Sequence, residues 1–234
     1  MKKLLTLIST AIFFASCTTK TGSGSIETQT RNHKNFKAVS ASGSFEVKLK
    51  QGNTYKVLIE ADDNIMDDIE TEVNGDKLII EFRDNLRLNN ITAKVFVEAP
   101  EFTFIGGSAS ADIESENSLQ SNKEINIKAS SAAAINLMVN APAIEAEASS
   151  GGSILLKGKT KSIDLQASSG AHLNADELLA ENAKVQASSG SEINLHASVN
   201  LNAKASSGAS VKYRGNATVS QQASSGGSIV RMNN

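Results

Sequence analysis

The sequence predicts an all-β protein: a parallel β-helix, or β-solenoid, with rungs of about 18–20 residues, preceded by a less regular β-rich section. Three observations predict this class. A small-residue motif recurs, apolar residues alternate on both sides of each copy, and aromatic residues make up only 4% of the chain, with no Trp. A period near 20 residues is typical of solenoids, in which each coil stacks on the previous one.

The recurring motif is Ala-Ser-Ser-Gly or a close variant, and it opens six successive segments. The copies begin at Ala129, Ala148, Ala167, Ala187, Ala205 and Ala223, so the steps are 19, 19, 20, 18 and 18 residues. Small side chains fit the inside of a tight bend, and Gly tolerates a positive φ there. If the inward–outward alternation continues through the corner, the second serine of each copy points into the coil. These serines are Ser131, Ser150, Ser169, Ser189, Ser207 and Ser225.

Apolar residues lie four and two positions before each corner and return at the same spacing after it. Around the copy at Ala167, Ile163 and Leu165 precede the corner, and Leu173 and Ala175 follow it. A period of two places these side chains on one face of a strand, so we expect them to fill the core while the polar residues between them face outward. The regular repeats therefore span residues 101–234.

Residues 34–100 show β-patterns with less regular spacing. Alternating apolar residues at 45–50 and again at 55–59 predict a β-hairpin or two neighbouring rungs. Asn-Gly-Asp at 74–76 predicts a turn into a strand at 77–82, and residues 61–69 suggest one short helical turn. We interpret residues 34–234 as a single solenoid domain.

The first residues have the anatomy of a secretory leader. Two lysines precede an apolar run, and Phe14-Ala15-Ser16-Cys17 resembles a bacterial lipobox. On that resemblance, residues 1–16 form a lipoprotein signal peptide and Cys17 is the lipidated first residue of the mature chain. The alternative is an ordinary signal peptide that contains a cysteine.

Residues 17–33 are polar and rich in Gly, Ser and Thr, which predicts a flexible tether to the membrane. Thr18 and Thr19 stand where the lipoproteins that this start resembles carry an Asp for inner-membrane retention or acidic residues for surface export. The chain is therefore expected to be an outer-membrane lipoprotein of the cell envelope, at the periplasmic face, with the cell surface as the alternative.

Charge and composition exclude several function classes. The formal net charge is −2 and there is no basic cluster, so no nucleic-acid partner is expected. The histidines, His33, His172 and His196, have no ligand spacing, and a regular series of serines lacks the single base-activated nucleophile of a hydrolase. We expect no catalytic residue, no cofactor and no metal site.

Two polar groupings were weighed as binding sites. The acidic segment 60–70 is interpreted as a solvated helical turn rather than a calcium site, because the Asp-x-Asp-x-Asp-Gly spacing is missing. Asn136, Asn174 and Asn194 are expected to align as an outward ladder. A solvated face is favoured there over a strip that contacts carbohydrate.

Several segments together resemble a known family. Phe36 to Val47 (FKAVSASGSFEV), Val57 to Asn64 (VLIEADDN), Leu78-Ile79-Ile80 and the Ser-Gly-rich repeats resemble the putative auto-transporter adhesin head GIN domain, a domain of unknown function numbered 2807. The resemblance covers roughly residues 34 to 232. It implies a β-helix-like fold, a lipoprotein of the Bacteroidetes type and no established catalytic residues. The family's Ser-Gly-Ser-Gly-Asp corner is replaced here by Ala-Ser-Ser-Gly, so no role of that Asp is carried over.

These observations favour a non-catalytic, lipid-anchored envelope module for adhesion or binding, with a glycan or an envelope protein as its ligand. One alternative is a structural scaffold that forms homo-oligomers through the exposed solenoid end near Ile229. The other is a β-helix carbohydrate-active enzyme. It is disfavoured because no acidic cluster recurs on adjacent rungs.

Overall fold

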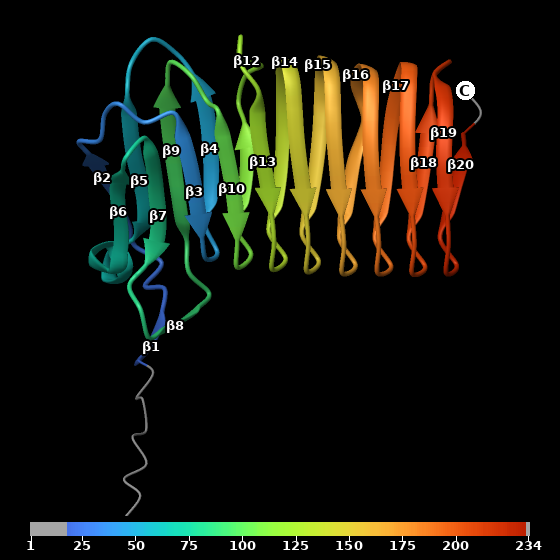
Figure 1. Cartoon of the computed structure of the whole chain (residues 1–234). Coiled ribbons are helices and arrows are strands. Elements are labelled where there is room, and N and C mark those ends of the chain that lie inside the picture. Colours follow the sequence, from blue (N-terminus) through green and yellow to red (C-terminus); the bar gives the residue numbers. More distant parts are fainter. Residues whose placement is uncertain (1–17, 233–234) are drawn as a thin grey trace, which may run out of the picture.

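The computed structural model describes residues 18–232, which form a rod of stacked coils (Figure 1). Strands account for 66% of the chain and helix for 3%, and the parallel strands stack into a solenoid of about six turns with rungs of about 20 residues. The predicted fold class is therefore confirmed. Within residues 18–232, no helix has the length and apolar character needed to cross a bilayer.

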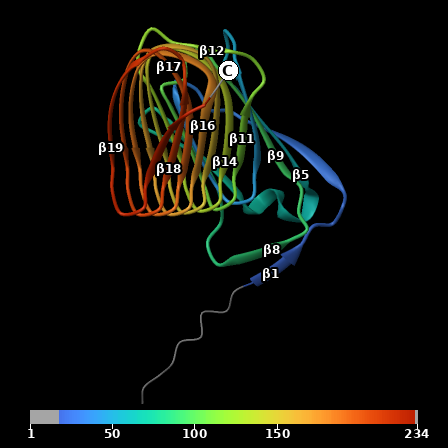
Figure 2. The same ribbon diagram turned by 90° about the vertical axis from the view of Figure 1, so that its right-hand side faces the viewer.

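The regular repeats begin with short strands and continue as long ones. Each of the long strands β14 to β17 leaves one corner, bends over the far side of the rod and returns to the next corner, so the coils overlie one another in Figure 2. The strands are β10 (Phe104–Ser108), β11 (Asp112–Ser115), β12 (Leu119–Gln120), β13 (Ile125–Ala129), β14 (Ala134–Ala148), β15 (Ser153–Ala167), β16 (His172–Ala187), β17 (Glu192–Ala205), β18 (Ser210–Arg214), β19 (Thr218–Ala223) and β20 (Ser228–Arg231).

Parallel pairing brings equivalent residues of successive coils into columns. Ile144 of β14 pairs with Ile163 of β15, which pairs with Ala183 of β16, which pairs with Leu201 of β17. All four are buried, as the alternating pattern predicts. The pattern weakens in the last coil, where Gln221 of β19 is exposed.

Each corner is a two-residue turn of the type I′ pattern, with positive φ at both central residues. In the corner after β15, the amide of Ala171 donates to the carbonyl of Ser168 at 3.1 Å, and φ is 54° at Ser169 and 71° at Gly170. Successive corners are bonded together, because the Gly170 amide also donates to the Ser189 carbonyl of the next coil at 3.0 Å.

The predicted inward direction of the second serines is wrong. These six serines have φ between 47° and 54° and lie exposed at the tips of the turns. Two consecutive residues with positive φ break the inward–outward alternation. The inward corner position falls instead on the residue after the turn, such as Ala171 (0% exposed) or Ser191 (1% exposed).

The N-terminal section starts the solenoid and covers its first coil. Strand β3 pairs in parallel with β10, and β4 pairs in parallel with β11, so both belong to the stack. The elements are β1 (Thr18–Thr21), β2 (Ile26–Arg31), β3 (Ala38–Ser42), β4 (Glu46–Gln51), β5 (Lys56–Asp62), the 3₁₀ helix η1 (Asp63–Asp68), β6 (Ile69–Asn74), β7 (Lys77–Phe82), β8 (Leu86–Asn89) and β9 (Ala93–Ala99).

The expected pairing of residues 45–50 with 55–59 is wrong. Strand β9 lies between β4 and β5, parallel to the first and antiparallel to the second. The predicted turn at residues 74–76 is confirmed, since β6 and β7 form an antiparallel hairpin in which Asn74 pairs with Lys77. The helical turn predicted within 61–69 is confirmed as η1.

The flexible tether expected over residues 17–33 is not what the structure shows for its described part. Strand β1 pairs in parallel with β8, and β2 pairs along its full length, antiparallel, with β5. Polar residues form strands here because non-local partners supply the hydrogen bonds that the local pattern does not reveal. The proposed signal peptide and Cys17 lie outside the described residues.

Candidate functional site: a groove beside the corners

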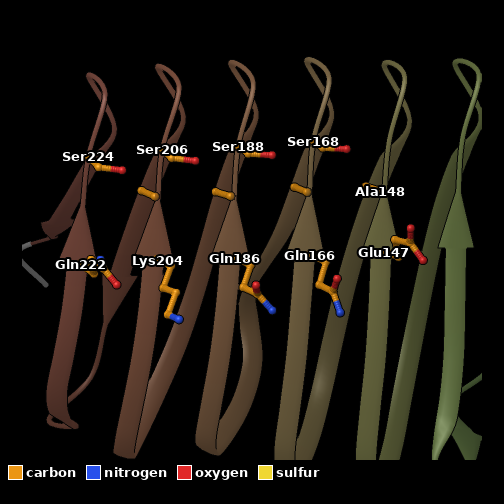
Figure 3. A pocket seen from close by; sticks show the side chains of 13 residues that line it. Glu147, Ala148, Gln166, Ser168, Gln186, Ser188, Lys204, Ser206, Gln222 and Ser224 are labelled. Carbon is orange, nitrogen blue, oxygen red and sulfur yellow. The ribbon is translucent and has the colours of Figure 1, made fainter.

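A groove of about 400 Å³ runs along the rod next to the stacked corners and crosses several coils (Figure 3). Two parallel rows of polar side chains line it, and the alanines of the corner motif lie between them. One row consists of the first serine of successive corners, Ser168, Ser188, Ser206 and Ser224. The other row consists of Glu147, Gln166, Gln186, Lys204 and Gln222.

The strand period explains why the rows form. In the segment Gln166-Ala167-Ser168, alternation turns the alanine inward, where it is 4% exposed, and leaves the glutamine and the serine on the outer surface. The parallel register then places Gln166 beside Gln186 of the next coil. Neighbouring strands lie about 4.8 Å apart, so each row repeats with that step along the rod.

The serine hydroxyls share one orientation across the four coils (Figure 3). A hydroxyl donates one hydrogen bond and accepts others, and a glutamine amide does both through separate atoms. The groove therefore presents donors and acceptors in a repeating order, and its central part around Gln166 and Gln186 carries no charge. Such a surface is suited to a polymer that itself repeats hydroxyl or amide groups.

The two charged residues of the groove lie toward its ends. Glu147 is bonded to Lys128 on the preceding coil, with the Nζ and Oε2 atoms 2.7 Å apart, and this bond raises the pKa of Lys128. The carboxylate of Glu147 is therefore already compensated by a neighbour. Lys204 lies beside Gln186 and Gln222 and leaves a single ammonium group near the other end.

The groove does not contain a catalytic constellation among its lining residues. Glycoside hydrolysis uses two carboxyl groups, and Glu147 is the one carboxylate that lines the groove. Across residues 18–232, no group of three or more His, Cys, Asp or Glu side chains is placed to hold a metal ion. Among the residues that line the groove, neutral hydrogen-bonding side chains outnumber ionisable ones.

The acidic segment 60–70 has a different role from the solvated turn that we expected. The side chains of Asp62 and Asp68 are buried, at 2% and 3% exposure, and they bond to the N-terminal segment. Sequence reasoning missed this role because the partners lie about 40 residues away. The segment therefore takes part in the attachment of residues 18–25.

The remaining candidate side chains do not assemble into a site. His172 is exposed, whereas His196 is half-buried with an unpartnered Nδ1, and Nε2 of His33 lies 2.9 Å from Oγ1 of Thr71. The predicted asparagine ladder is not continuous, because Leu155 occupies its position in the coil between Asn136 and Asn174. Asn174 and Asn194 do pair as neighbours.

The groove residues were not predicted from the sequence, because within each motif a direction was assigned only to the second serine. The signal was present in the sequence, since the position before the corner alanine carries Gln three times, at Gln166, Gln186 and Gln222. A polar residue, an alanine and a serine in a row predict two outward side chains beside a bend. The alternation that turns the corner alanine inward already places the first serine on the surface.

Comparison with solved structures supports the fold over nearly the whole chain. A putative adhesin from Bacteroides fragilis matches with a TM-score of 0.83 at 18% identity, covering 91% of this chain and 98% of the other. A putative adhesin from Parabacteroides merdae gives 0.76 at 16% identity, with coverage of 92% and 100%. A putative lipid binding protein from Parabacteroides distasonis gives 0.75 at 19% identity, again with coverage of 92% and 100%.

At these identities the likeness concerns the fold alone. No curated protein matches the chain. The family model described as "Putative auto-transporter adhesin, head GIN domain" matches residues 35–217, which is most of the chain. This match agrees with the resemblance of the N-terminal segments and the Ser-Gly-rich repeats, and the chain belongs to this family of head GIN domains.

Proposed function

We propose that this chain is a non-catalytic, lipid-anchored adhesion module of the cell envelope that binds an extended, neutral polysaccharide along the groove beside its corners. The observation that carries the proposal is the pair of parallel rows, one of serine hydroxyls and one mainly of glutamine amides, that repeat with each coil. On such a surface, specificity depends on how well the repeat of the ligand matches the repeat of the coils.

The spacing favours a polymer over a small molecule. Each coil adds one serine and one longer polar side chain at a step of about 4.8 Å, so a ligand with a similar step meets equivalent groups on every coil. Single contacts of this kind contribute about 0.5–1.5 kcal/mol each. Several coils acting together add their contacts without a further loss of translational freedom.

The charge distribution favours a neutral polymer. The groove centre at Gln166 and Gln186 has no charged side chain, and Glu147 is compensated by Lys128. A polyanion would gain only the ammonium group of Lys204, and its backbone would meet the carboxylate of Glu147 at the opposite end. Hydroxyl groups of a sugar polymer match both rows without any buried charge.

Two further observations support the cellular setting. The family and two of the three structural neighbours described above carry the adhesin description, which is in keeping with a protein of the cell envelope or surface. The stretch Phe14-Ala15-Ser16-Cys17 supports a lipid on Cys17, and Thr18 and Thr19 after it favour the outer membrane, at its periplasmic face. Incorporation of labelled palmitate by the wild type and its loss in Cys17→Ser would test the anchor.

The binding proposal is tested with full-length protein and immobilised neutral polysaccharides. Ser188→Tyr places a large side chain in the middle of the groove and leaves the core untouched, so we expect affinity to fall at least about tenfold. Asn174→Tyr adds the same bulk on the strand after the corner and serves as the matched control. If both variants bind the polysaccharides with equal affinity, the groove is not the binding site.

The enzymatic alternative has a direct readout. The same polysaccharides are incubated with the protein and assayed for new reducing ends or unsaturated products. We expect none. Depolymerisation that disappears with Glu147→Gln would replace the adhesion module by a carbohydrate-active enzyme.

A further inference from the structure

The segment that follows the proposed lipidation site is fastened to the domain by a buried carboxylate. Asp62 accepts hydrogen bonds from the backbone amides of Gly24 and Thr92, each at 2.7 Å, and is 2% exposed. Gly22 is packed against the same carboxylate. A Cβ atom at Gly22 would lie 2.5 Å from both the Asp62 side chain and the Asn90 carbonyl, so no larger residue fits.

The 3₁₀ helix η1 adds a second set of contacts. Lys20 forms an ion pair with Asp68 at 2.5 Å, and this carboxylate is 3% exposed. The Asn64 side chain donates to the Thr21 carbonyl at 2.8 Å and accepts from the Ser23 amide at 3.2 Å. Two buried carboxylates, Asp62 with backbone amides as partners and Asp68 with the Lys20 ammonium group, make this a defined docking site for residues 20–24.

Order extends to the first described residue. The Thr18 amide donates to the Asn85 carbonyl at 3.1 Å, and β1 then follows β8 in parallel register from Thr18 to Thr21. Beyond the docking site, β2 continues the attachment along β5. The body of the domain is therefore connected to residue 18 without a free linker.

We propose that the two-stranded ribbon of β1 and β8 rests directly on the lipid bilayer, so that the solenoid is held in a fixed orientation rather than swinging on a tether. This inference rests on the proposed function in one respect, the lipid on Cys17. One residue spans at most about 3.6 Å, so a lipidated Cys17 would bring the bilayer surface to the start of β1.

The chemistry of the ribbon fits a lipid surface. Arg87 is exposed on β8 between the half-buried Leu86 and Leu88. A guanidinium group beside anionic headgroups is attracted by about 1 kcal/mol. Leu86 and Leu88 alternate with Arg87 and therefore face the other side of the strand, where Leu88 packs against the core. The ribbon projects from the rod on the side where the corners lie, which turns the corner side toward the membrane (Figures 1 and 2).

The orientation can be measured by quenching. Cys17 is the only cysteine of the chain, and lipidation consumes its thiol, so one introduced cysteine can be labelled alone. Full-length Asn89→Cys, on the ribbon, and Met138→Cys, on the far side of the coils, are labelled with a fluorophore. Both are reconstituted into vesicles of phosphatidylethanolamine and phosphatidylglycerol that contain a brominated lipid. We expect quenching at position 89 to be severalfold stronger than at position 138, and equal quenching would overturn the proposal.

A second experiment removes the contacts that dock residues 20–24. Gly22→Val and Asp62→Ala should release residues 18–25, so quenching at position 89 should fall toward the value at position 138, and trypsin should cleave after Lys20. Ser25→Ala, on the same segment, is the matched control and should change neither. Unchanged quenching in both release variants would show that docking does not set the orientation. Absence of lipid on Cys17 would overturn both the anchor and this inference, whereas lipidated protein without quenching would overturn this inference alone.

Discussion

The N-terminal section packs around aromatic side chains, whereas the regular repeats pack around aliphatic ones. Phe36, Phe45 and Phe102 are fully buried near the start of the rod, and the rings of Phe45 and Phe82 stack with centroids 4.0 Å apart. After Phe104, the only aromatic residue of the Phe, Tyr and Trp group is Tyr213. The same stack of parallel strands therefore begins on a wide core and continues on a narrow one.

This difference follows from what each region must cover. A coil in the middle of the rod is closed above and below by identical coils, so small and branched side chains fill its interior. The first coil has no preceding coil of its own kind, and β5, β6 and β9 close the sheet there with antiparallel as well as parallel pairing. Larger side chains fill the space that this irregular closure leaves.

The largest expected loss of stability comes from removing a buried aromatic ring in the N-terminal section. Phe45→Ala removes a ring that is 1% exposed and should cost about 3–5 kcal/mol of the free energy of unfolding. Leu165→Ala in a middle coil should cost less, because the two facing sheets can close on a smaller gap. Denaturant titration of both variants measures the difference, and equal losses would remove the distinction between the two cores.

A smaller effect is expected at the corners. Gly170 has φ of 71° and Ala132 has φ of 63° at the same turn position. Gly170→Ala should destabilise by about 1 kcal/mol, because a side chain in the left-handed region is strained. Ala132→Gly should stabilise by roughly 0.5 kcal/mol, since part of the relieved strain is offset by the freer unfolded chain. Thermal unfolding of the pair checks the opposite signs, and shifts in the same direction would contradict this explanation.

The junction between the two regions should depend on pH. Lys48 of β4 lies 2.8 Å from Glu114 of β11 and 2.9 Å from Glu46, and hydrogen bonds to these carboxylates raise the pKa of Lys48 to about 12. Hydrogen bonds from Lys48 and Lys94 lower the pKa of Glu46. Lys48→Met should therefore cost about 1 kcal/mol at neutral pH.

The sign of the pH effect follows from the two shifts. Because the pKa of Glu46 is lowered, this carboxylate stabilises the fold fully above the ordinary carboxyl pKa. Its contribution to the free energy of unfolding is lost as pH falls through the lowered pKa. Because the pKa of Lys48 is raised, its contribution to the free energy of unfolding is present below the ordinary lysine pKa and is lost as pH rises through about 12. The wild type and Lys48→Met should thus converge in acid, which stability curves at pH 7 and pH 3 would show. A constant difference would refute the ion-pair account.

The smallest effect is expected at an exposed pair within the repeats. Lys212 bonds to Glu192 of the preceding coil at 2.7 Å, which lowers the pKa of Glu192. Both side chains are about a third exposed or more, so Lys212→Met should cost only about 0.5 kcal/mol. The loss should disappear in 1 M salt, where charges are screened within about 3 Å. A loss that salt leaves unchanged would point to packing of the lysine stem.

The sequence predicted the repeated coils because their determinants are local. A period of two predicts the inward direction of Ile163, Leu165 and the corner alanine Ala167. The same pattern recurs in every coil because the coils stack in parallel. The second serines were misplaced because direction through a bend depends on backbone φ. Ser169 lies in the left-handed region, where alternation no longer applies.

The N-terminal section was less predictable because its determinants are distant in sequence. Strand β9 enters between β4 and β5 from more than 30 residues away, and Asp62 gives Gly24 an acceptor across 38 residues. The alternation of Val95, Val97 and Ala99 indicates a strand, but it does not indicate which strands β9 pairs with. The two polar rows of the groove could be predicted from the sequence, since Gln166-Ala167-Ser168 and Gln186-Ala187-Ser188 repeat with the coil and alternation turns their first and third side chains outward.

The bonded corners have a consequence for how such a protein changes over generations. Each corner before the last donates the same hydrogen bond to the next corner, from Gly151 to Ser169, from Gly170 to Ser189 and onward to Ser225. A whole coil can therefore be duplicated or deleted while its neighbours keep the same corner bonds. Tandem copying of one coil would lengthen the groove by one serine and one glutamine position. The length of the groove can thus change by gene duplication in steps of one coil, while the irregular first coils stay the same.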